Sequence, residues 1–189
     1  MGDIIDIALI NNRFKELNPL DFGKQECGPN YSYGPCIRKY TLIHYVFSGC
    51  GILTNPSGTY PVSAGEAFLI RPYELASYKA DEEKPWYYTW IGFDGELSAH
   101  FESLPTILPS LGVVFNDMQQ VFRLNGACEE FLAGKLFELY ARLFNNKENQ
   151  DSYLLKISNY IDTKYNSAHC DVADIAAALN LERHYLARL

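Results

Sequence analysis

Hydrophobic and polar residues alternate in short runs over the first half of this chain. An alternation with a period of two predicts β-strands that bury one face. The runs that show it are residues 22–27, 39–47, 52–55, 59–62, 67–71, 76–80 and 86–93. Because turn residues separate these short runs, the pattern indicates an antiparallel barrel or sandwich.

The run at residues 86–93 is the richest in aromatic residues. Since side chains alternate across a strand, Trp86, Tyr88 and Trp90 share one face. The Tyr88 hydroxyl and the two indole N–H groups need hydrogen-bond partners if they are buried. We therefore expect this face to line a pocket for a sugar or another small polar ring.

Two residues of other strands are candidates for the same pocket. His44 shares a strand face with Leu42 and Val46, and Tyr78 lies in the run before the charged loop. We expect both to be neighbours of the aromatic strand. The alternative stays open that the aromatic face only fills the core of a structural or dimerisation module.

The hydrophobic period becomes helical from Asp117 onward. Apolar residues recur there at spacings of three and four, which predicts amphipathic helices. The predicted helices cover residues 129–144, 151–165, 171–179 and 182–189. Polar, turn-prone residues at 145–150 make this segment the best linker candidate.

Three segments lack a clear period. Residues 1–18 are predicted to form an arm or an edge strand, and an arm would be a candidate lid for the pocket. Gly34 and Pro35 predict a turn, and Pro105 and Pro109 indicate a loop.

The C-terminal helices carry a helix-turn-helix spacing. Ala176 allows two helices to approach closely, Asn180 accepts the positive φ of the turn, and Leu186 packs between the helices. Asp171 is a good N-cap for the helix that precedes the turn. A generic helical hairpin is the alternative interpretation.

Composition and charge narrow the class of protein. The chain has 189 residues, a formal net charge of −7 and five cysteines without a CxxC pair. An acidic balance argues against a simple basic nucleic-acid module, and the odd cysteine count favours reduced thiols in the cytoplasm. No apolar run is long enough for a transmembrane helix, and the N-terminus is not a signal peptide, so we expect no membrane partner.

The residues indicate neither a metal site nor a catalytic one. The four histidines are spread along the chain, with only His44 and Glu66 in the barrel region, whereas a metal site needs clustered ligands. Gly49-Cys50-Gly51 is better explained as a hairpin turn than as a nucleophile loop. We expect no catalytic residues, no metal and no cofactor. The rival hypothesis is a cupin-like enzyme acting on a small sugar, which would need a metal or an acid/base pair in the barrel.

Several motifs, taken in order, resemble the AraC/XylS family of bacterial transcription regulators. They are Tyr33-Gly34-Pro35, residues 42–46 with the following glycines, residues 65–72, residues 78–81, residues 85–93 and residues 175–189. The resemblance covers residues 22–189.

The resemblance implies a β + α fold, in which a cupin-like antiparallel β-barrel of the jelly-roll type is followed by dimerisation helices and part of a three-helix helix-turn-helix unit. It implies a homodimer, a small-molecule effector that is typically a carbohydrate, and control of DNA binding. The expected division is a barrel with an N-terminal arm at 1–115, dimerisation helices at 116–145, a linker at 146–150 and the start of the DNA-binding domain at 151–189.

The candidate ligand-binding residues are Tyr78, Tyr88, Trp90, His44, Trp86 and Arg38. The residues expected to face the DNA major groove in an intact regulator are Arg183, His184, Ala187 and Arg188. The family has a second helix-turn-helix unit that is not found here, and Glu182 stands where a serine usually caps the recognition helix. We therefore expect a truncated part of a longer regulator, in which only the full-length protein binds DNA.

Overall fold

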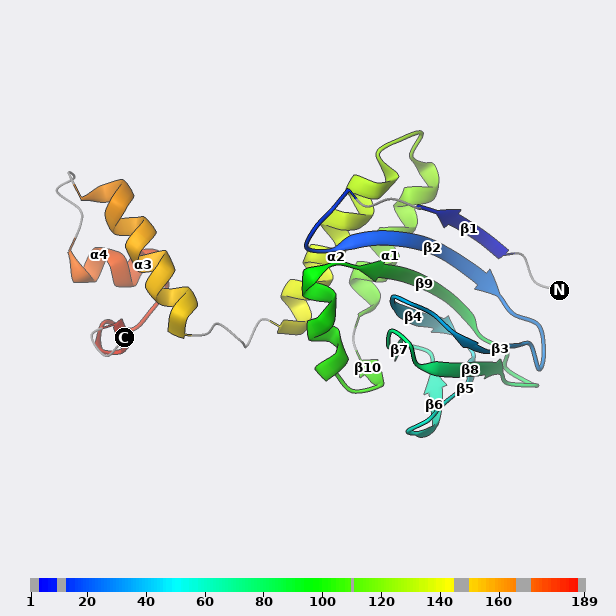
Figure 1. Ribbon diagram of the computed structural model, residues 1–189. Coiled ribbons are helices and arrows are strands. Elements are labelled where there is room, and N and C mark those ends of the chain that lie inside the picture. Colours follow the sequence, from blue (N-terminus) through cyan, green and yellow to red (C-terminus); the bar gives the residue numbers. More distant parts are fainter. Residues whose placement is uncertain (1–3, 10–12, 110, 145–149, 166–170, 187–189) are drawn as a thin grey trace. The chain divides into compact units, whose positions relative to one another are not determined.

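The computed structural model describes residues 4–9, 13–109, 111–144, 150–165 and 171–186. They belong to two compact units, Met1–Ala141 and Arg142–Leu189 (Figure 1). We call them the barrel unit and the C-terminal unit. In the described part of the chain, none of the helices combines the length and apolar character that a membrane span requires.

The barrel unit is built on two antiparallel sheets. The larger sheet contains, in spatial order, β1 (Ile4–Ala8), β2 (Asn18–Glu26), β9 (Tyr87–Asp94), β4 (Thr41–Ser48), β7 (Glu66–Ile70) and β10 (Ile107–Pro109). The smaller sheet contains β3 (Ser32–Ile37), β8 (Leu75–Ala80), β5 (Cys50–Asn55) and β6 (Gly58–Ser63). The predicted antiparallel two-sheet architecture is confirmed.

The strand register brings distant residues into rows on the inner face of the larger sheet. In one row, Asp6, Gly23, Trp90, His44 and Phe68 are successive cross-strand partners on β1, β2, β9, β4 and β7. Side chains opposite one another in a sheet are close enough to touch. A residue from the first strand and a residue from the seventh therefore border the same interior space.

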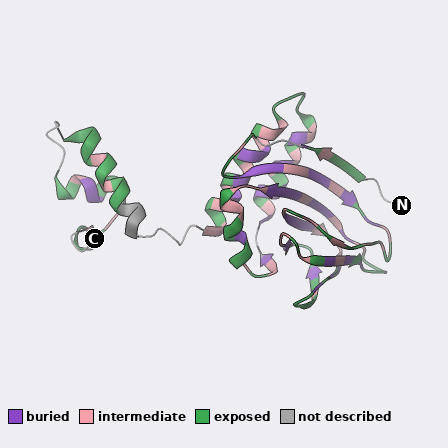
Figure 2. Cartoon of the chain, viewed as in Figure 1, coloured by how far each residue is buried: buried purple, intermediate pink, exposed green. Residues whose placement is uncertain are grey.

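Helices cover the opposite face of the larger sheet. They are η1 (Glu96–Ser103), α1 (Gly112–Met118), η2 (Gln119–Arg123) and α2 (Cys128–Phe144). Aromatic pairs join the layers: the ring centroids of Tyr45 and Phe115 are 5.4 Å apart, and those of Phe93 and Phe101 are 4.8 Å apart. Both faces of the central strands of this sheet are consequently buried (Figure 2), which explains why β4 is buried at six successive positions, whereas the edge strand β1 is mostly exposed.

Two strands of the barrel were not predicted. Gly34 and Pro35, expected in a turn, lie inside β3, where the pairing with β8 shifts register between Tyr33 and Cys36. Pro109 belongs to β10 rather than to a loop. Proline is tolerated at bulges and edge strands, and β3 and β10 are both edge strands, so the turn residues there were misleading.

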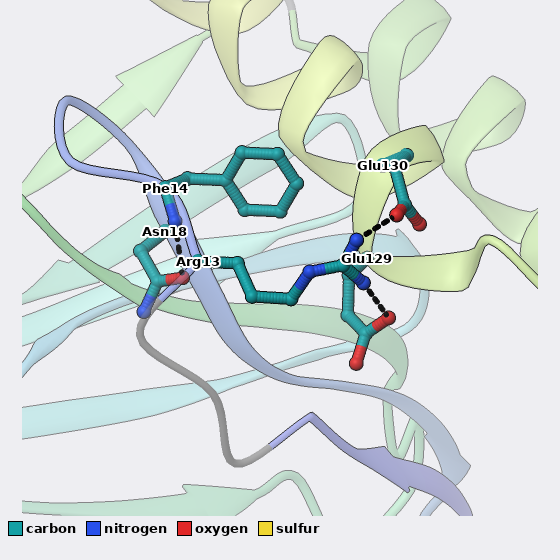
Figure 3. A network of polar contacts seen from close by, with 5 residues as sticks. All are labelled: Arg13, Phe14, Asn18, Glu129 and Glu130. Atoms are coloured by element: carbon teal, nitrogen blue, oxygen red, sulfur yellow. Dashed lines mark hydrogen bonds and ion pairs between the residues drawn. The ribbon is translucent and has the colours of Figure 1, made fainter.

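The N-terminal segment is an edge strand that is also tied to a helix. β1 pairs with β2 over its whole length, which decides between the two alternatives of arm and strand. After the strand, Arg13 donates to Glu129 at 3.3 Å and to Glu130 at 2.5 Å, both near the start of α2 (Figure 3).

The C-terminal unit contains the predicted helices. They are α3 (Gln150–Lys164), α4 (Val172–Ala178) and α5 (Arg183–Leu186). Asp171 caps α4 through the backbone N–H of Asp174, and the Asp174 side chain accepts from the Asp171 N–H in return. Asn180 has a φ of 52°, as the turn requires, and the Leu181 N–H donates to the Ala176 carbonyl.

Candidate functional site: an effector cavity inside the barrel

A cavity of about 290 Å³ opens inside the barrel unit beside Trp90. Its walls come from β1, β2, β4 and β9 of the larger sheet, from β3 and β8 of the smaller sheet, and from residues flanking β3. Ligand pockets in proteins start near about 300 Å³. The cavity therefore suits a ligand of about one small ring.

Five of the six candidate ligand-binding residues line this cavity. They are Tyr78, Tyr88, Trp90, His44 and Arg38. Trp86 does not line it, because its ring is fully buried and stacks on Phe68 with the centroids 5.6 Å apart. The alternation along the strand is as predicted, but only its later half borders the cavity.

His44 lies at the centre of an aromatic cage. Its ring stacks on Phe68 at 4.5 Å between centroids and is 5.0 Å from both Tyr78 and Tyr88. Burial, with a smaller effect from the Arg38 charge, lowers the pKa of His44 well below its ordinary value. The imidazole is therefore neutral, and its buried Nδ1 has no hydrogen-bond partner among the described residues.

The Tyr88 hydroxyl is already satisfied by the protein. It donates to the Gln25 side-chain oxygen at 3.0 Å, across the β2–β9 pairing. Burial raises the pKa of Tyr88, so the phenol stays protonated. Tyr88 thus gives the cavity a fixed aromatic wall whose polar tip has a partner before any ligand arrives.

Arg38 is held against the tyrosines of the smaller sheet. Its Nη2 donates to the Tyr33 hydroxyl at 3.0 Å, and its guanidinium lies 5.0 Å from the centroid of the Tyr33 ring. Tyr33 in turn stacks on Tyr78 at 5.3 Å. Nη1 donates to the Cys36 sulfur at 3.3 Å, while the buried Nε has no partner among the described residues.

Asp21 is the main cavity residue that the sequence interpretation missed. Its Oδ2 accepts from the Tyr40 hydroxyl at 2.6 Å, and its Oδ1 is buried without a hydrogen bond in the described structure. Burial raises the pKa of Asp21, against the opposing effects of the Tyr40 hydroxyl, the Arg38 charge, the Trp90 side chain and the Gly92 backbone. The sequence signal that could have revealed Asp21 was the series of polar or small residues at alternate positions of a strand, Asp21, Gly23 and Gln25.

The described residues around the cavity can be compared with the groups that metal and nucleophilic sites require. Within the described residues, no three His, Cys, Asp or Glu side chains converge as a metal site would require. Burial raises the pKa of the Cys27 thiol to about 11, which removes its nucleophilicity at neutral pH. What the cavity presents is an aromatic wall with a few convergent polar atoms, the usual composition of a small-ligand site.

The candidate DNA-contacting residues can be located only in part. Arg183 and His184 are exposed on α5 in the C-terminal unit. Ala187 and Arg188 lie outside the described residues.

Comparisons with known proteins identify the family of the domain that forms the barrel. The model of the AraC-like ligand binding domain matches residues 19–152. The Msm operon regulatory protein of Streptococcus mutans is 28% identical over 98% of this chain and 75% of its own length. The raffinose operon transcriptional regulatory protein RafR of Pediococcus pentosaceus is 29% identical over 95% of this chain and 72% of its own length.

A third relative and a solved structure extend the comparison. The lactose operon transcription activator of Staphylococcus xylosus is 26% identical over 90% of this chain and 70% of its own length. A structure of ToxT from Vibrio cholerae matches 93% of this chain and 75% of its own chain, at 14% identity and a TM-score of 0.50, which supports the fold alone.

The three relatives are all named as regulators, which confirms the prediction of a non-enzymatic role over the rival cupin-like enzyme. The β + α architecture with a cupin-like barrel is likewise confirmed. This chain belongs to the AraC family of regulators, and residues 19–152 contain its AraC-like ligand-binding domain.

Proposed function

We propose that the barrel unit binds a carbohydrate effector in the cavity beside Trp90 and that effector binding controls DNA binding by the regulator. The observation that carries this proposal is a set of three buried atoms without a hydrogen-bond partner in the described structure, Asp21 Oδ1, Arg38 Nε and His44 Nδ1, all on cavity-lining residues. An unpaired buried polar atom costs about 1–3 kcal/mol. A hydroxyl-rich ring stacked on Trp90 would supply the missing partners.

The ligand contacts in this proposal are Tyr78, Tyr88, Trp90, His44 and Arg38, with Trp86 as support behind the aromatic wall. The names of the relatives favour a sugar, because they refer to raffinose and lactose operons. Control of DNA binding further requires that the effector bind two arrangements of the regulator with different affinity.

Dimerisation through the helices at 116–145 is part of the proposal. On α2, Gly134, Phe137 and Ala141 are exposed at spacings of three and four, and Phe137 is 42% exposed. Residues at this spacing share one face of a helix. A large aromatic side chain between two small residues suits close contact with a second copy of the chain.

The C-terminal unit would supply the DNA contacts, through Arg183 and His184 together with Ala187 and Arg188, in the intact regulator in the cytoplasm. In this division, residues 1–115 form the effector barrel, 146–150 the linker, and 151–189 the first part of the DNA-binding domain.

Thermal melts with a panel of sugars test the effector. A sugar present at 100 times its Kd adds about 2.7 kcal/mol to the free energy of unfolding. The panel contains glucose, galactose, fructose, lactose, melibiose and raffinose. Trp90→Ala removes the stacking surface, so its melting temperature should not respond to the sugar that stabilises the wild type. An equal response in this variant would contradict the proposed site.

Sedimentation velocity tests the dimer. Phe137→Glu should give a monomer at a concentration where the wild type is a dimer. Tyr73→Glu is the matched control, because Tyr73 is an aromatic residue of the barrel that is 71% exposed. A dimer that survives Phe137→Glu would exclude this face of α2 as the interface.

A further inference from the structure

We infer that the effector is a neutral, unphosphorylated sugar and that Asp21 is the residue that selects it over its phosphorylated form. The inference rests on the proposed function, since it concerns the same cavity. It depends on how many charged groups line that cavity and on which of them already have hydrogen-bond partners.

Asp21 presents an acceptor to the cavity and nothing else. On β2 its neighbours in register are Ala8 and Gly92, neither of which offers a side-chain donor. The Tyr40 hydroxyl occupies Oδ2, and the buried Oδ1 lies beside Gly92. A sugar hydroxyl can donate to a carboxylate, whereas a phosphate dianion has no proton to donate and would be repelled by it.

The positive charge around the cavity is too small to offset that repulsion. Among the residues that line it, Arg38 is the single cation, against the two carboxylates of Asp21 and Asp6. Each terminal nitrogen of Arg38 already donates one hydrogen bond, to Tyr33 and to Cys36, and the buried Nε has no partner in the described structure. His44 adds no charge because its buried ring is neutral.

A phosphate group needs a different kind of site. It carries a charge of about −1.5 to −2 and three strong acceptor oxygens. Proteins meet it with bidentate arginines or with the free backbone N–H groups of a helix N-terminus. The walls of this cavity are strands paired in sheets, whose N–H groups mostly bond to neighbouring strands. A hydroxyl-bearing ring carries no charge and is suited to the groups present here: the carboxylate of Asp21, the N–H groups of Arg38 and the neutral ring of His44.

The selection of an unphosphorylated sugar restricts the kind of uptake reaction that can supply the effector. If the effector carries no phosphate, the uptake step that supplies it must deliver the sugar unmodified. A transport reaction that phosphorylates the sugar during entry would not produce the molecule that this cavity accepts.

Titration calorimetry on the whole chain at pH 7.5 and constant ionic strength tests the inference. Each sugar of the panel that has an available phosphate ester is compared with that ester, for example galactose with galactose 6-phosphate and glucose with glucose 6-phosphate. We expect a bound sugar to lose at least tenfold in affinity when it is phosphorylated. An ester that binds equally well or better would overturn this inference and leave a carbohydrate effector standing. If neither free sugars nor esters bind, the proposed function itself fails.

Asp21→Asn tests the residue. Asparagine keeps the shape and an acceptor for Tyr40 but removes the charge, so the ratio between the affinities for free and phosphorylated sugar should fall about tenfold. Asp162→Asn, on the exposed side of α3 in the C-terminal unit, removes the same charge elsewhere and should leave the ratio unchanged. An unchanged ratio in Asp21→Asn would overturn the role of Asp21.

Tyr40→Phe provides a second variant in case Asp21→Asn does not fold. It removes the hydrogen bond to Asp21 Oδ2 and keeps the carboxylate charge. Free-sugar binding should weaken about three- to tenfold, while the discrimination against the ester should remain. Loss of discrimination in this variant would show that charge on Asp21 is not its source.

Discussion

Trp86 and Trp90 mark two parts of one barrel interior that look alike in sequence and differ in structure. Both lie against a glycine of another strand, Gly51 on β5 of the smaller sheet and Gly23 on β2. A Cβ on Gly51 would be 2.4 Å from the Trp86 ring, and a Cβ on Gly23 would be 2.2 Å from the Trp90 ring. Trp86 is fully buried, whereas Trp90 is only partly buried and borders the cavity. We call these regions the filled end and the open end.

The two ends differ in the residues that surround each tryptophan. Around the filled end, Leu53, Val62 and Phe68 belong to the same core as Trp86, whose own indole nitrogen is buried without a partner in the described structure. Around the open end, charged Asp21 and Arg38 keep atoms without partners in the described structure. Close packing makes a tryptophan structural, while unsatisfied polar atoms beside a cavity make it a binding surface.

Alanine substitution of each tryptophan should give the largest difference in the free energy of unfolding between the filled end and the open end. Trp86→Ala empties a close-packed site and should lower the free energy of unfolding by about 3–5 kcal/mol. Trp90→Ala should cost less than about 2 kcal/mol, because one side of that ring already faces a cavity. Urea denaturation of both variants measures the difference. Equal losses would mean that Trp90 is also a packing residue.

A methyl group added beneath each tryptophan gives a finer comparison. Gly51→Ala forces a Cβ against the fully buried Trp86 ring and to 2.5 Å from the Lys79 carbonyl oxygen, so we expect a loss of about 1–3 kcal/mol. Gly23→Ala can push Trp90 into the cavity, although its Cβ would also lie 2.8 Å from the carbonyl oxygen of Ile5 on the edge strand β1. Its cost in stability should be smaller, but sugar-induced stabilisation should disappear. Thermal melts with and without sugar measure both effects. A Gly23→Ala protein that still responds to sugar would contradict this account.

The neutral His44 predicts a pH dependence that belongs to the open end. Unfolded His44 takes up a proton below about pH 6.5, whereas the folded ring resists protonation because of its lowered pKa. The stabilisation is therefore fully present above that pH and is lost as the pH falls towards the folded pKa, by up to about 1.4 kcal/mol per pH unit. Urea titrations between pH 7 and pH 5 measure this slope, which His44→Gln should remove.

The effect of His44 has to be separated from the titration of Asp21, which also changes the stability with pH. Its raised pKa acts in the opposite sense, because stability from that group is lost as pH rises from its ordinary value of 3.8 through the raised pKa. The His44 comparison is therefore best made in an Asp21→Asn background. A slope that persists there without His44 would assign the pH dependence to another residue.

The smallest effect is expected outside the barrel interior, at the contact in Figure 3. The Arg13 side chain is 56% exposed and pairs with Glu129 and Glu130. Exposed ion pairs are worth about 0–1 kcal/mol and weaken in salt. Arg13→Ala should therefore lower the free energy of unfolding by less than about 1 kcal/mol at low salt and by less at 0.5 M salt. A larger loss would show that this contact holds β1 in its position against β2.

The periodic elements of the fold could be predicted, and the irregular ones could not. The alternation of Leu42, His44 and Val46 gave the correct inner face of β4, and Asp171 and Asn180 gave the correct cap and turn. The strands β3 and β10 escaped because proline and glycine usually interrupt pairing. Only the neighbouring strands β8 and β7 make pairing possible at those positions.

The part of the candidate site that aromatic residues form could be predicted from the sequence. Alternation correctly grouped Trp86, Tyr88 and Trp90, and His44 was correctly expected beside Tyr78. Asp21 was missed because a single charged residue in a weakly patterned strand is usually exposed. Asp21 lines the cavity because β2 lies between β1 and β9. This strand order depends on contacts between residues that are far apart in the sequence.

By itself, the sequence determined the order of the clearly periodic strands and helices, the inner face of each clear strand, and the membership of the chain in a family of regulators. These follow from local periodicity and from motifs that are contiguous along the chain. Only the tertiary structure decided which tryptophan is core and which borders a cavity, and that Asp21, Arg38 and His44 surround one space. The physical reason is that burial and unpaired polar atoms arise between strands from distant parts of the chain, which no local pattern records.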